Sequence, residues 1–347
     1  MASPVTDTAW LQWIAKLTGG ASRQRCAATF PPDSFYCLLD ELPLHLIPRW
    51  FLESRRFRIC EPELFLNPNC HLCQAGQLPT DLDLRAEWPP GFALQGTMAW
   101  VRDPETTSLL PFWLGPQMEA AVSSLRPSEP APQTLPEEVR FLLAAAGILV
   151  AGDHAERRTH EWEHVVSNAA PAFREKGYVP LGNLLHPFHV AALRRYYRRM
   201  VRRGEMRLGD NSTSRRYVAP NESVARFFHH QIANAVSAIA GEAVKPSYVY
   251  VASYLTGAEL KKHTDREQCQ FSVTLCLDFS PEPALETSWP LRLETAQGGV
   301  AVYQALGDGL VYRGTKIPHY RDMLTGDRTS TSVFFHYVPM DFAGPLD

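Results

Sequence analysis

The stretch that decides the fold begins at His263-Thr264-Asp265, continues to His319, and ends at Arg328-Thr329-Ser330. His263 and Asp265 are two residues apart in a strand pattern, so both side chains point to one face, roughly 7 Å apart at the backbone. His319 follows 54 residues later, and strands that far apart can become neighbours in a rolled sheet. Two histidines and one carboxylate can bind one face of an octahedral metal ion and leave the rest open. These residues therefore predict an oxygen-activating iron site.

Arg328 lies nine residues beyond His319 and opens a stretch, 329–338, in which β-branched and aromatic residues alternate. The planar guanidinium of arginine pairs with a carboxylate through two parallel hydrogen bonds. Arg328 therefore indicates a co-substrate that carries a carboxylate. A co-substrate that binds the metal through two atoms would take two of the open positions and leave the third for oxygen.

The pattern around these residues predicts the fold class α+β. Residues 187–203 and 222–240 have the periodicity of helices, and Gly241 stops the second one. Strand patterns, separated by turn signals, occur at residues 177–181, 247–255, 259–263, 270–278, 290–294, 299–303, 309–313 and 329–338. Helices followed by such a series of short strands predict a C-terminal double-sheet β-barrel with helical buttresses.

With this order of strands, the chain resembles the Fe(II)- and 2-oxoglutarate-dependent dioxygenases, most closely their prolyl-hydroxylase-like branch. The resemblance covers roughly residues 175–340, about half of the chain. It is carried by Tyr254, His263, Asp265, His319 and Arg328. It implies a double-stranded β-helix, that is, a jelly-roll or cupin-like barrel. It also implies that the two histidines and the aspartate bind Fe(II), with 2-oxoglutarate and O2 as co-substrates.

The resemblance implies further roles around the metal. Arg328 would pair with the distal carboxylate of 2-oxoglutarate, and Tyr254 could donate a hydrogen bond to it. Ser330 would complete an Arg-x-Ser arrangement. Asp265 supplies a carboxylate where halogenases of this fold leave a vacant position for chloride, so the resemblance implies a hydroxylase.

Substrate recognition is less closely defined by the sequence. Arg313 and Arg321 flank His319, and either could meet a substrate carboxylate or be a surface or salt-bridge residue. The resemblance implies hydroxylation of a C–H bond in an amino-acid residue of a peptide or protein, with release of succinate and CO2. A free amino acid or another small metabolite is the alternative substrate.

The N-terminal half is predicted to be a mixed, mainly helical domain. A helix is expected at 8–18 and short helices at 35–52. The proline-rich segment 127–136 reads as a connector, and a charged helix is expected at 153–167. The predicted division is an N-terminal domain of unknown role at 1–128, a connector with helices at 129–168, and the dioxygenase domain at 169–347.

The bulk properties are those of a globular protein, with 45% hydrophobic and 20% charged residues. The net charge of −3 gives no basic field for nucleic acid. No apolar run reaches the roughly 18 residues of a membrane span, and no signal peptide is visible. Seven cysteines, an odd number spread thinly, indicate a reducing compartment, which places the protein in the cytoplasm.

Two other patterns suggest metal binding. His160-Glu161-Trp162-Glu163-His164 matches the zinc-hydrolase pattern H-E-x-x-H, although its charged surroundings favour a solvated linker helix. Cys70-His71-Leu72-Cys73, with Cys60 ten residues earlier, could contribute to a small zinc site. Without a second Cys pair, incidental cysteines are the simpler interpretation.

A stripe of arginines on the helix at 187–203 could bind an acidic partner or nucleic acid. A solvated helix face is the simpler interpretation. A barrel that used this stripe without catalysis would be a non-catalytic partner-binding protein, which the intact metal residues argue against. The arginines are Arg194, Arg195, Arg198, Arg199, Arg202 and Arg203.

Overall fold

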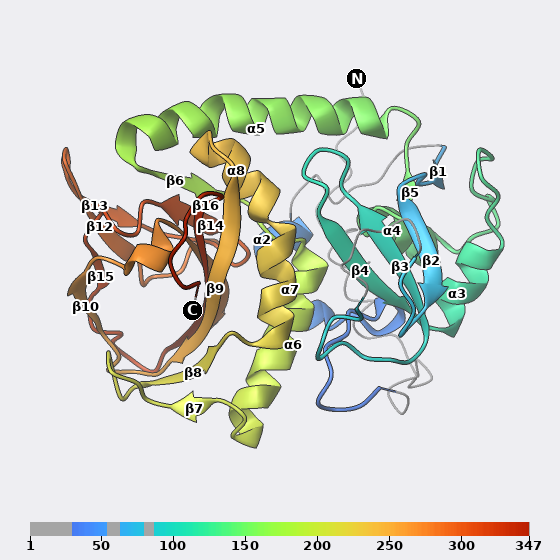
Figure 1. The fold of residues 1–347 in the computed structure, drawn as a ribbon. Helices are drawn as coiled ribbons and strands as arrows, with labels where there is room; N and C mark the ends of the chain where they lie inside the picture. The colour runs from blue at the N-terminus through green and yellow to red at the C-terminus, as the bar shows by residue number, and fades with distance from the viewer. Residues whose placement is uncertain (1–29, 54–62, 80–86, 347) are drawn as a thin grey trace.

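The computed structural model describes residues 30–53, 63–79 and 87–346. Within them, the C-terminal half contains two antiparallel sheets (Figure 1). The larger sheet has the strand order β6 (Tyr178–Leu181), β14 (Gly309–Tyr312), β11 (Phe271–Ser280), β16 (Thr329–Pro339), β9 (Val244–Tyr254), β8 (Arg216–Pro220) and β7 (Arg207–Leu208). The smaller sheet has the order β10 (Leu260–His263), β15 (His319–Arg321), β12 (Leu291–Thr295) and β13 (Gly298–Val302).

The two sheets face each other across a mainly apolar interior. Tyr254 of the larger sheet packs against Trp289, which precedes β12, with ring centroids 5.0 Å apart. Tyr312 of β14 packs in the same way against His319 of β15, at 4.8 Å. The structure is therefore a mixed α/β fold with a large antiparallel sheet. The eight predicted strands are all present, each within three residues of its predicted bounds, whereas the short strands β7, β8 and β15 were not predicted.

Helices cover the outer face of the larger sheet. They are α5 (His154–Lys176), α6 (Pro187–Arg203), α7 (Ser223–Gln231) and α8 (Ala233–Ala240). Helix α6 has the predicted bounds, because the His186 side chain accepts from the Phe188 N–H at its start and Gly204 adopts φ +71° at its end. The single helix predicted at 222–240 is wrong in one respect: it is broken at Ile232, which ends α7 and precedes α8. Helix α5 is longer than predicted.

The N-terminal half contains more strand than the predicted mainly helical domain. Its centre is a three-stranded antiparallel sheet of β2 (Cys70–Gln74), β3 (Thr97–Arg102) and β4 (Leu109–Leu114). These strands escaped prediction because β3 and β4 are buried on both faces, so their residues do not alternate between apolar and polar. The remaining elements of this half are β1 (Phe65–Leu66), β5 (Leu149–Val150), α2 (Arg49–Glu53), α3 (Pro116–Ser123), α4 (Glu137–Ala145), and the 3₁₀ turns η2 (Leu39–Glu41) and η3 (Leu44–Leu46). A further 3₁₀ turn, η5 (Glu267–Cys269), lies in the C-terminal half between β10 and β11. The helix predicted at 8–18 lies outside the described residues.

One hydrophobic core connects the two halves. The N-terminal sheet lies beside α6 and α7, which separate it from the larger barrel sheet, and α5 extends across both (Figure 1). Phe35 packs against Tyr196 of α6 and Phe228 of α7, with ring centroids 5.9 and 5.7 Å apart. The same buried cluster reaches Phe335 in β16. The division at residue 168 stays a prediction, and the core runs across it.

The arginines of α6 do not all lie on a solvated face. Arg194 is fully buried and pairs with Asp278 and Glu282 at 2.9 and 2.5 Å. Arg195 and Arg199 donate to main-chain carbonyls of the N-terminal segment. The stripe therefore connects α6 to neighbouring parts of this chain, which corrects the interpretation as a solvated face.

Candidate metal centre

The three residues of the predicted triad meet where β10 and β15 pair. His263 ends β10, His319 begins β15, and the two are direct partners across the antiparallel pair, with ring centroids 4.4 Å apart. Asp265 follows two residues after His263, and its N–H donates to the Gly314 carbonyl at 2.9 Å. Its Oδ1 is 3.7 Å from His263 Nε2 and 3.5 Å from His319 Nε2. One donor atom from each residue lies within 4.8 Å of the other two, so one ion could contact all three.

Hydrogen bonds orient both imidazoles. His263 Nδ1 is 2.7 Å from the Lys261 carbonyl, and His319 Nδ1 is 3.0 Å from the Ile317 carbonyl. Because Nδ1 must carry the proton to donate to a carbonyl, each Nε2 keeps its lone pair for a metal. Histidines that bind metals are typically fixed in this way by their second nitrogen.

The protonation states also suit a metal. Burial alone would raise the pKa of Asp265, but His319, His336 and the Ser272 hydroxyl hold that pKa well below its ordinary value. Burial, together with the neighbouring His319, lowers the pKa of His263. The centre therefore presents a carboxylate and a neutral imidazole at neutral pH, which is the form in which these groups bind metals.

Three residues that surround the Asp265 carboxylate were not predicted from the sequence. Ser272 of β11 donates to Asp265 Oδ2 at 2.7 Å, and His336 of β16 lies 3.0 Å from the same hydroxyl. Gly314 leaves space that a Cβ would fill. Their positions along the chain gave no signal, because only the pairing of β11 with β14 and β16 brings them to Asp265. With Cys269, the residues Asp265 and His336 form a second, overlapping group of possible ligands.

Tyr254, the predicted hydrogen-bond donor to the co-substrate, packs against Trp289 in the interior between the two sheets. It is fully buried, and Arg216, its direct partner on β8, donates from Nη1 to its hydroxyl at 2.8 Å. Asp210 accepts from the other two nitrogens of Arg216, Nε at 2.9 Å and Nη2 at 2.5 Å. Burial alone would raise the pKa of Asp210, but hydrogen bonds from Arg216 and Tyr250 lower it to about 2. The Arg216 charge is therefore neutralised within the barrel wall.

Arg328 and Ser330 lie where β16 begins. Ser330 is buried and is the direct partner of Tyr254. Arg328 precedes the strand and is partly exposed. Its Nη1 donates to the Thr325 carbonyl at 3.3 Å, and its main-chain N–H contacts the Thr256 hydroxyl. The guanidinium thus bonds to its own loop.

Arg313 and Arg321, the candidate substrate residues, lie in different surroundings. Arg313 stacks over Phe173 and Phe271, 5.2 and 5.5 Å from their ring centroids, and so lies against α5 and the helix-covered side of the sheet. Arg321 is buried, follows His319 by two residues on β15, and stacks over Trp289 at 4.7 Å. The structure therefore brings only Arg321 toward the metal ligands.

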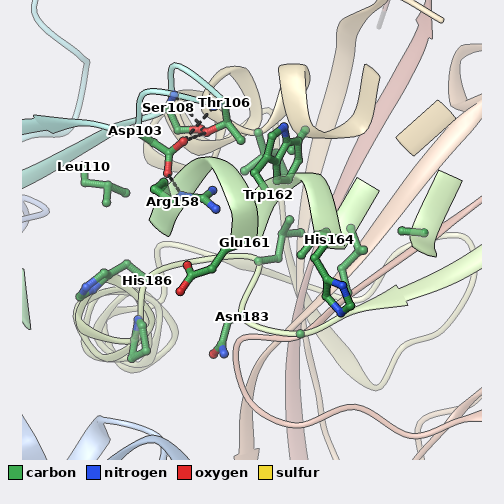
Figure 2. A pocket seen from close by; sticks show the side chains of 18 of the residues that line it. Asp103, Thr106, Ser108, Leu110, Arg158, Glu161, Trp162, His164, Asn183 and His186 are labelled. Atoms are coloured by element: carbon green, nitrogen blue, oxygen red, sulfur yellow. Dashed lines mark hydrogen bonds and ion pairs between the residues drawn. The ribbon is translucent and has the colours of Figure 1, made fainter. Parts of the chain in front are cut away.

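The H-E-x-x-H pattern does not form a metal site with other described residues. His160 and His164 are exposed on α5, and neither belongs to a described group of three possible ligands. A cavity of about 950 Å³ lies under this helix (Figure 2). His164 and Arg158 line it, but His160 does not. None of the residues of the metal triad lines this cavity.

The cysteine pattern is likewise unsupported as a zinc site within the described residues. Cys70 and Cys73 are free thiols on β2. Cys73 Sγ lies 3.1 Å from the Gln77 carbonyl, and burial raises the pKa of Cys70 to about 12. Cys60 lies outside the described residues.

No protein-family model and no curated protein matches this chain. Its structure is similar to that of the non-heme alpha-ketoglutarate-dependent epimerase SnoN from nogalamycin biosynthesis, with 15% identity over 52% of this chain and 88% of that one, at a TM-score of 0.43. It is also similar to a Pseudomonas putida prolyl-4-hydroxylase, with 18% identity over 49% and 98% of the two chains, at 0.40.

A prolyl hydroxylase from Trichoplax adhaerens, solved with a peptide fragment of a hypoxia-inducible factor, is similar with 12% identity over 53% of this chain and 93% of that one, at a TM-score of 0.43. Each of these likenesses covers about half of this chain. Within the described residues, no helix combines the length and apolar character needed to cross a membrane.

Proposed function

We propose that this chain is a 2-oxoglutarate-dependent dioxygenase whose Fe(II) is bound by His263, Asp265 and His319. The observation that carries the proposal is the convergence of two imidazole Nε2 atoms and one carboxylate oxygen within 4.8 Å. A 2-His-1-carboxylate set suits non-heme Fe(II) and leaves positions open for co-substrate and oxygen. The two facing sheets would then form the predicted double-stranded β-helix, in the predicted dioxygenase domain at 169–347.

The protein's own residues hold and shield this centre. The carbonyls of Lys261 and Ile317 fix the imidazoles, and Ser272 fixes Asp265. Tyr312, fully buried, places its hydroxyl 3.4 Å from His319 Nε2 and closes one side. Bound iron with 2-oxoglutarate and O2 would supply an oxidant for an unactivated C–H bond, with succinate and CO2 as products.

For the substrate we propose, from the sequence resemblance, an amino-acid residue in a peptide or protein. A free amino acid or small metabolite is the alternative. The free thiols of Cys37, Cys269 and Cys276 fit the reducing, cytoplasmic setting that we also propose.

The test begins without oxygen. The purified protein is mixed with Fe(II) and 2-oxoglutarate, and the visible absorption band of their complex is recorded. Oxygen and pools of peptides or amino acids are then added, and succinate is measured. We expect His319→Ala and Asp265→Ala to lose the band, and His160→Ala to keep it. A wild-type protein with neither band nor succinate would refute the proposal.

A further inference from the structure

The cavity under α5 lies apart from the metal centre and takes its walls from both halves of the chain. Its volume is about 950 Å³. It is enclosed by α5, the end of α4, the loop between β3 and β4, the segment from β6 to the start of α6, and the junction of α7 and α8 (Figure 2). Cavities of roughly 300–1,000 Å³ at the junction of structural units are typical binding sites for small molecules.

Much of the wall is apolar. Val165 of α5 lines the cavity and is 38% exposed, which is unusual for a large aliphatic side chain in this protein. A ligand with an apolar body would remove this surface from water, and that burial is favourable. Other apolar residues of the wall are Leu110, Ala145, Leu184, Pro187, Ile232 and Ala235.

The charged side chains of the lining do not balance. Arg158 donates from Nε to Asp103 at 2.6 Å and also lies over the Trp162 ring, 5.7 Å from its centroid. Asp103 and Arg158 therefore neutralise each other. Glu161, the third such side chain in the lining, has no hydrogen bond or ion pair within the described residues. The cavity thus keeps one uncompensated negative charge.

The histidines of the lining do not supply the missing positive charge. His186 Nε2 contacts the Ala145 carbonyl at 2.9 Å, and its Nδ1 accepts from the Phe188 N–H at 3.2 Å. Burial lowers the pKa of His186 to about 4, so this imidazole is neutral at pH 7. His164 lies with its ring nitrogens 3.4 Å from the Asn168 amide and forms no ion pair with Glu161. A bound ligand is left to provide the counter-charge.

Glu161 faces a second hydrogen-bonding group across the cavity. Figure 2 shows its carboxylate pointing from α5 into the cavity, on the side where Asn183 lies. Asn183 has φ +54°, and its main-chain N–H donates to Asp308 Oδ1 at 3.1 Å, while its amide has no hydrogen bond within the described residues. The Glu161 carboxylate and the Asn183 amide oxygen both accept hydrogen bonds, and an ammonium group has three donors and no acceptor.

We propose that this cavity binds a small organic cation, with an ammonium group beside Glu161 and Asn183 and an apolar body against Val165 and Ile232. The carboxylate supplies the charge that the ligand complements, and the apolar wall supplies the contact area. No residue of the metal triad lines the cavity, so binding there requires neither the metal nor the proposed oxygenase activity.

The experiment compares three probes that share a phenyl ring and a four-carbon chain. They are 4-phenylbutylamine, 4-phenylbutanol and 4-phenylbutanoate, whose end groups are positive, neutral and negative. Each is titrated into the full-length chain with isotope-labelled tryptophan at about pH 8, where imidazoles are neutral. Binding is followed by NMR through the indole N–H signal of Trp162, which lines the cavity and is assigned with Trp162→Phe.

Three variants separate charge from shape. Glu161→Gln removes the charge and keeps the size of the side chain. Glu163→Gln is the matched control, because Glu163 is exposed on the same helix but does not line the cavity. Val165→Trp fills space one helical turn from Glu161, on the same face of α5.

We expect the wild type to bind the amine roughly fivefold more tightly than the alcohol, as for a solvent-accessible ion pair, and the carboxylate more weakly than either. Glu161→Gln should bind the amine and the alcohol alike, whereas Glu163→Gln should keep the wild-type preference. Val165→Trp should bind none of the probes while its melting temperature stays that of the wild type.

Several results would overturn the proposal. One is a Trp162 signal that does not move with the amine, and another is equal affinity of the wild type for the amine and the alcohol. A loss of preference in Glu163→Gln as large as that in Glu161→Gln would show a diffuse surface charge and no site. If Val165→Trp melts at a lower temperature, the comparison of probes on the wild type and the two glutamate variants decides alone.

Discussion

A Cβ atom placed on Gly314 would lie 2.3 Å from Oδ2 of Asp265, the carboxylate whose own N–H donates to the Gly314 carbonyl. The same Cβ would lie 2.4 Å from Ser272 Oγ and 2.5 Å from the Cys269 carbonyl. The Asp265 carboxylate therefore occupies the space that a side chain at position 314 would take, and the main chain of Asp265 is fixed by its hydrogen bond to the Gly314 carbonyl.

This relationship predicts that Gly314→Ala will lose metal affinity. The methyl group must displace the Asp265 carboxylate or the β14–β15 loop, so we expect metal affinity to fall tenfold or more, at a stability cost of about 1–3 kcal/mol. Metal competition titration and urea unfolding measure the two effects. Gly299→Ala in β13 is the control, because the atom nearest to its added Cβ, Glu294 Oε2, would be 3.9 Å away. Equal metal affinity in both variants would contradict the expectation.

Ser272→Ala tests whether the Ser272 hydroxyl supports Asp265, with a smaller structural change than Gly314→Ala. It removes the 2.7 Å hydrogen bond to Asp265 Oδ2 without adding bulk. Loss of such an outer partner typically weakens metal binding about 10–100-fold. Ser253→Ala is the control, because Ser253 bonds to Thr331 and not to a metal ligand. If both variants bind Fe(II) as tightly as the wild type does, Ser272 does not support the centre.

Arg194→Met should destabilise the whole fold. It leaves Asp278 with Arg198 alone and removes a donor from the Leu46 carbonyl. Breaking a buried ion pair from one side costs roughly 3–5 kcal/mol, and the remaining Arg198 pair favours the lower end. Urea unfolding should show this loss, whereas Arg202→Met, on the exposed side of α6, should change the midpoint little. Similar midpoints for the two variants would count against the buried network.

Acid should unfold the protein over a defined pH range. Burial lowers the pKa of His186 to about 4 and that of His189 and His229 to about 3. In the unfolded chain they titrate near about 6.5, so between these values the unfolded state binds more protons. The free energy of unfolding therefore has its full value above about pH 6.5 and falls as the pH drops toward 4. Each of these histidines lowers it by about 1.4 kcal/mol per pH unit.

The control for the acid effect is His189→Gln, whose amide can still donate to the Pro111 carbonyl that His189 Nε2 now contacts at 2.8 Å. When stability from urea unfolding is plotted against pH, the slope for this variant should be shallower by the contribution of one proton. Asp210, with its pKa lowered to about 2, acts in the same direction, but only below about pH 4. An unchanged slope would show that His189 is not the titrating group.

The convergence of the three candidate metal ligands could be predicted from the sequence because it depends on strand periodicity and on one strand pair. His263 and Asp265 share a face because side chains two residues apart in a strand pattern point the same way. His319 lies on β15, the strand that pairs with β10. The surroundings of the two arginines that follow His319 could not be predicted in the same way. Arg321 and Arg328 are both arginines shortly after His319, and only the tertiary structure shows that one is buried without a counter-ion while the other bonds to its loop.

Periodicity also explains which parts of the fold were predicted. The barrel strands alternate or are bounded by glycine turns, so their positions were clear. Strands β3 and β4 are buried on both faces, and a continuous apolar run does not distinguish strand from helix. Arg194 was assigned to a solvated face because charge usually marks solvent. Its acceptors, Asp278 and Glu282, lie more than 80 residues away.

The position of β16 also limits when this chain can fold. It is the last strand along the described chain, yet it lies between β11 and β9 near the middle of the larger sheet. During synthesis, β9 and β11 therefore have no native partner between them until residues 329–339 have been made. Pairing over such sequence separations is slow and leaves strand edges open meanwhile. A nascent chain of this protein must keep an unfinished sheet from aggregating until β16 arrives.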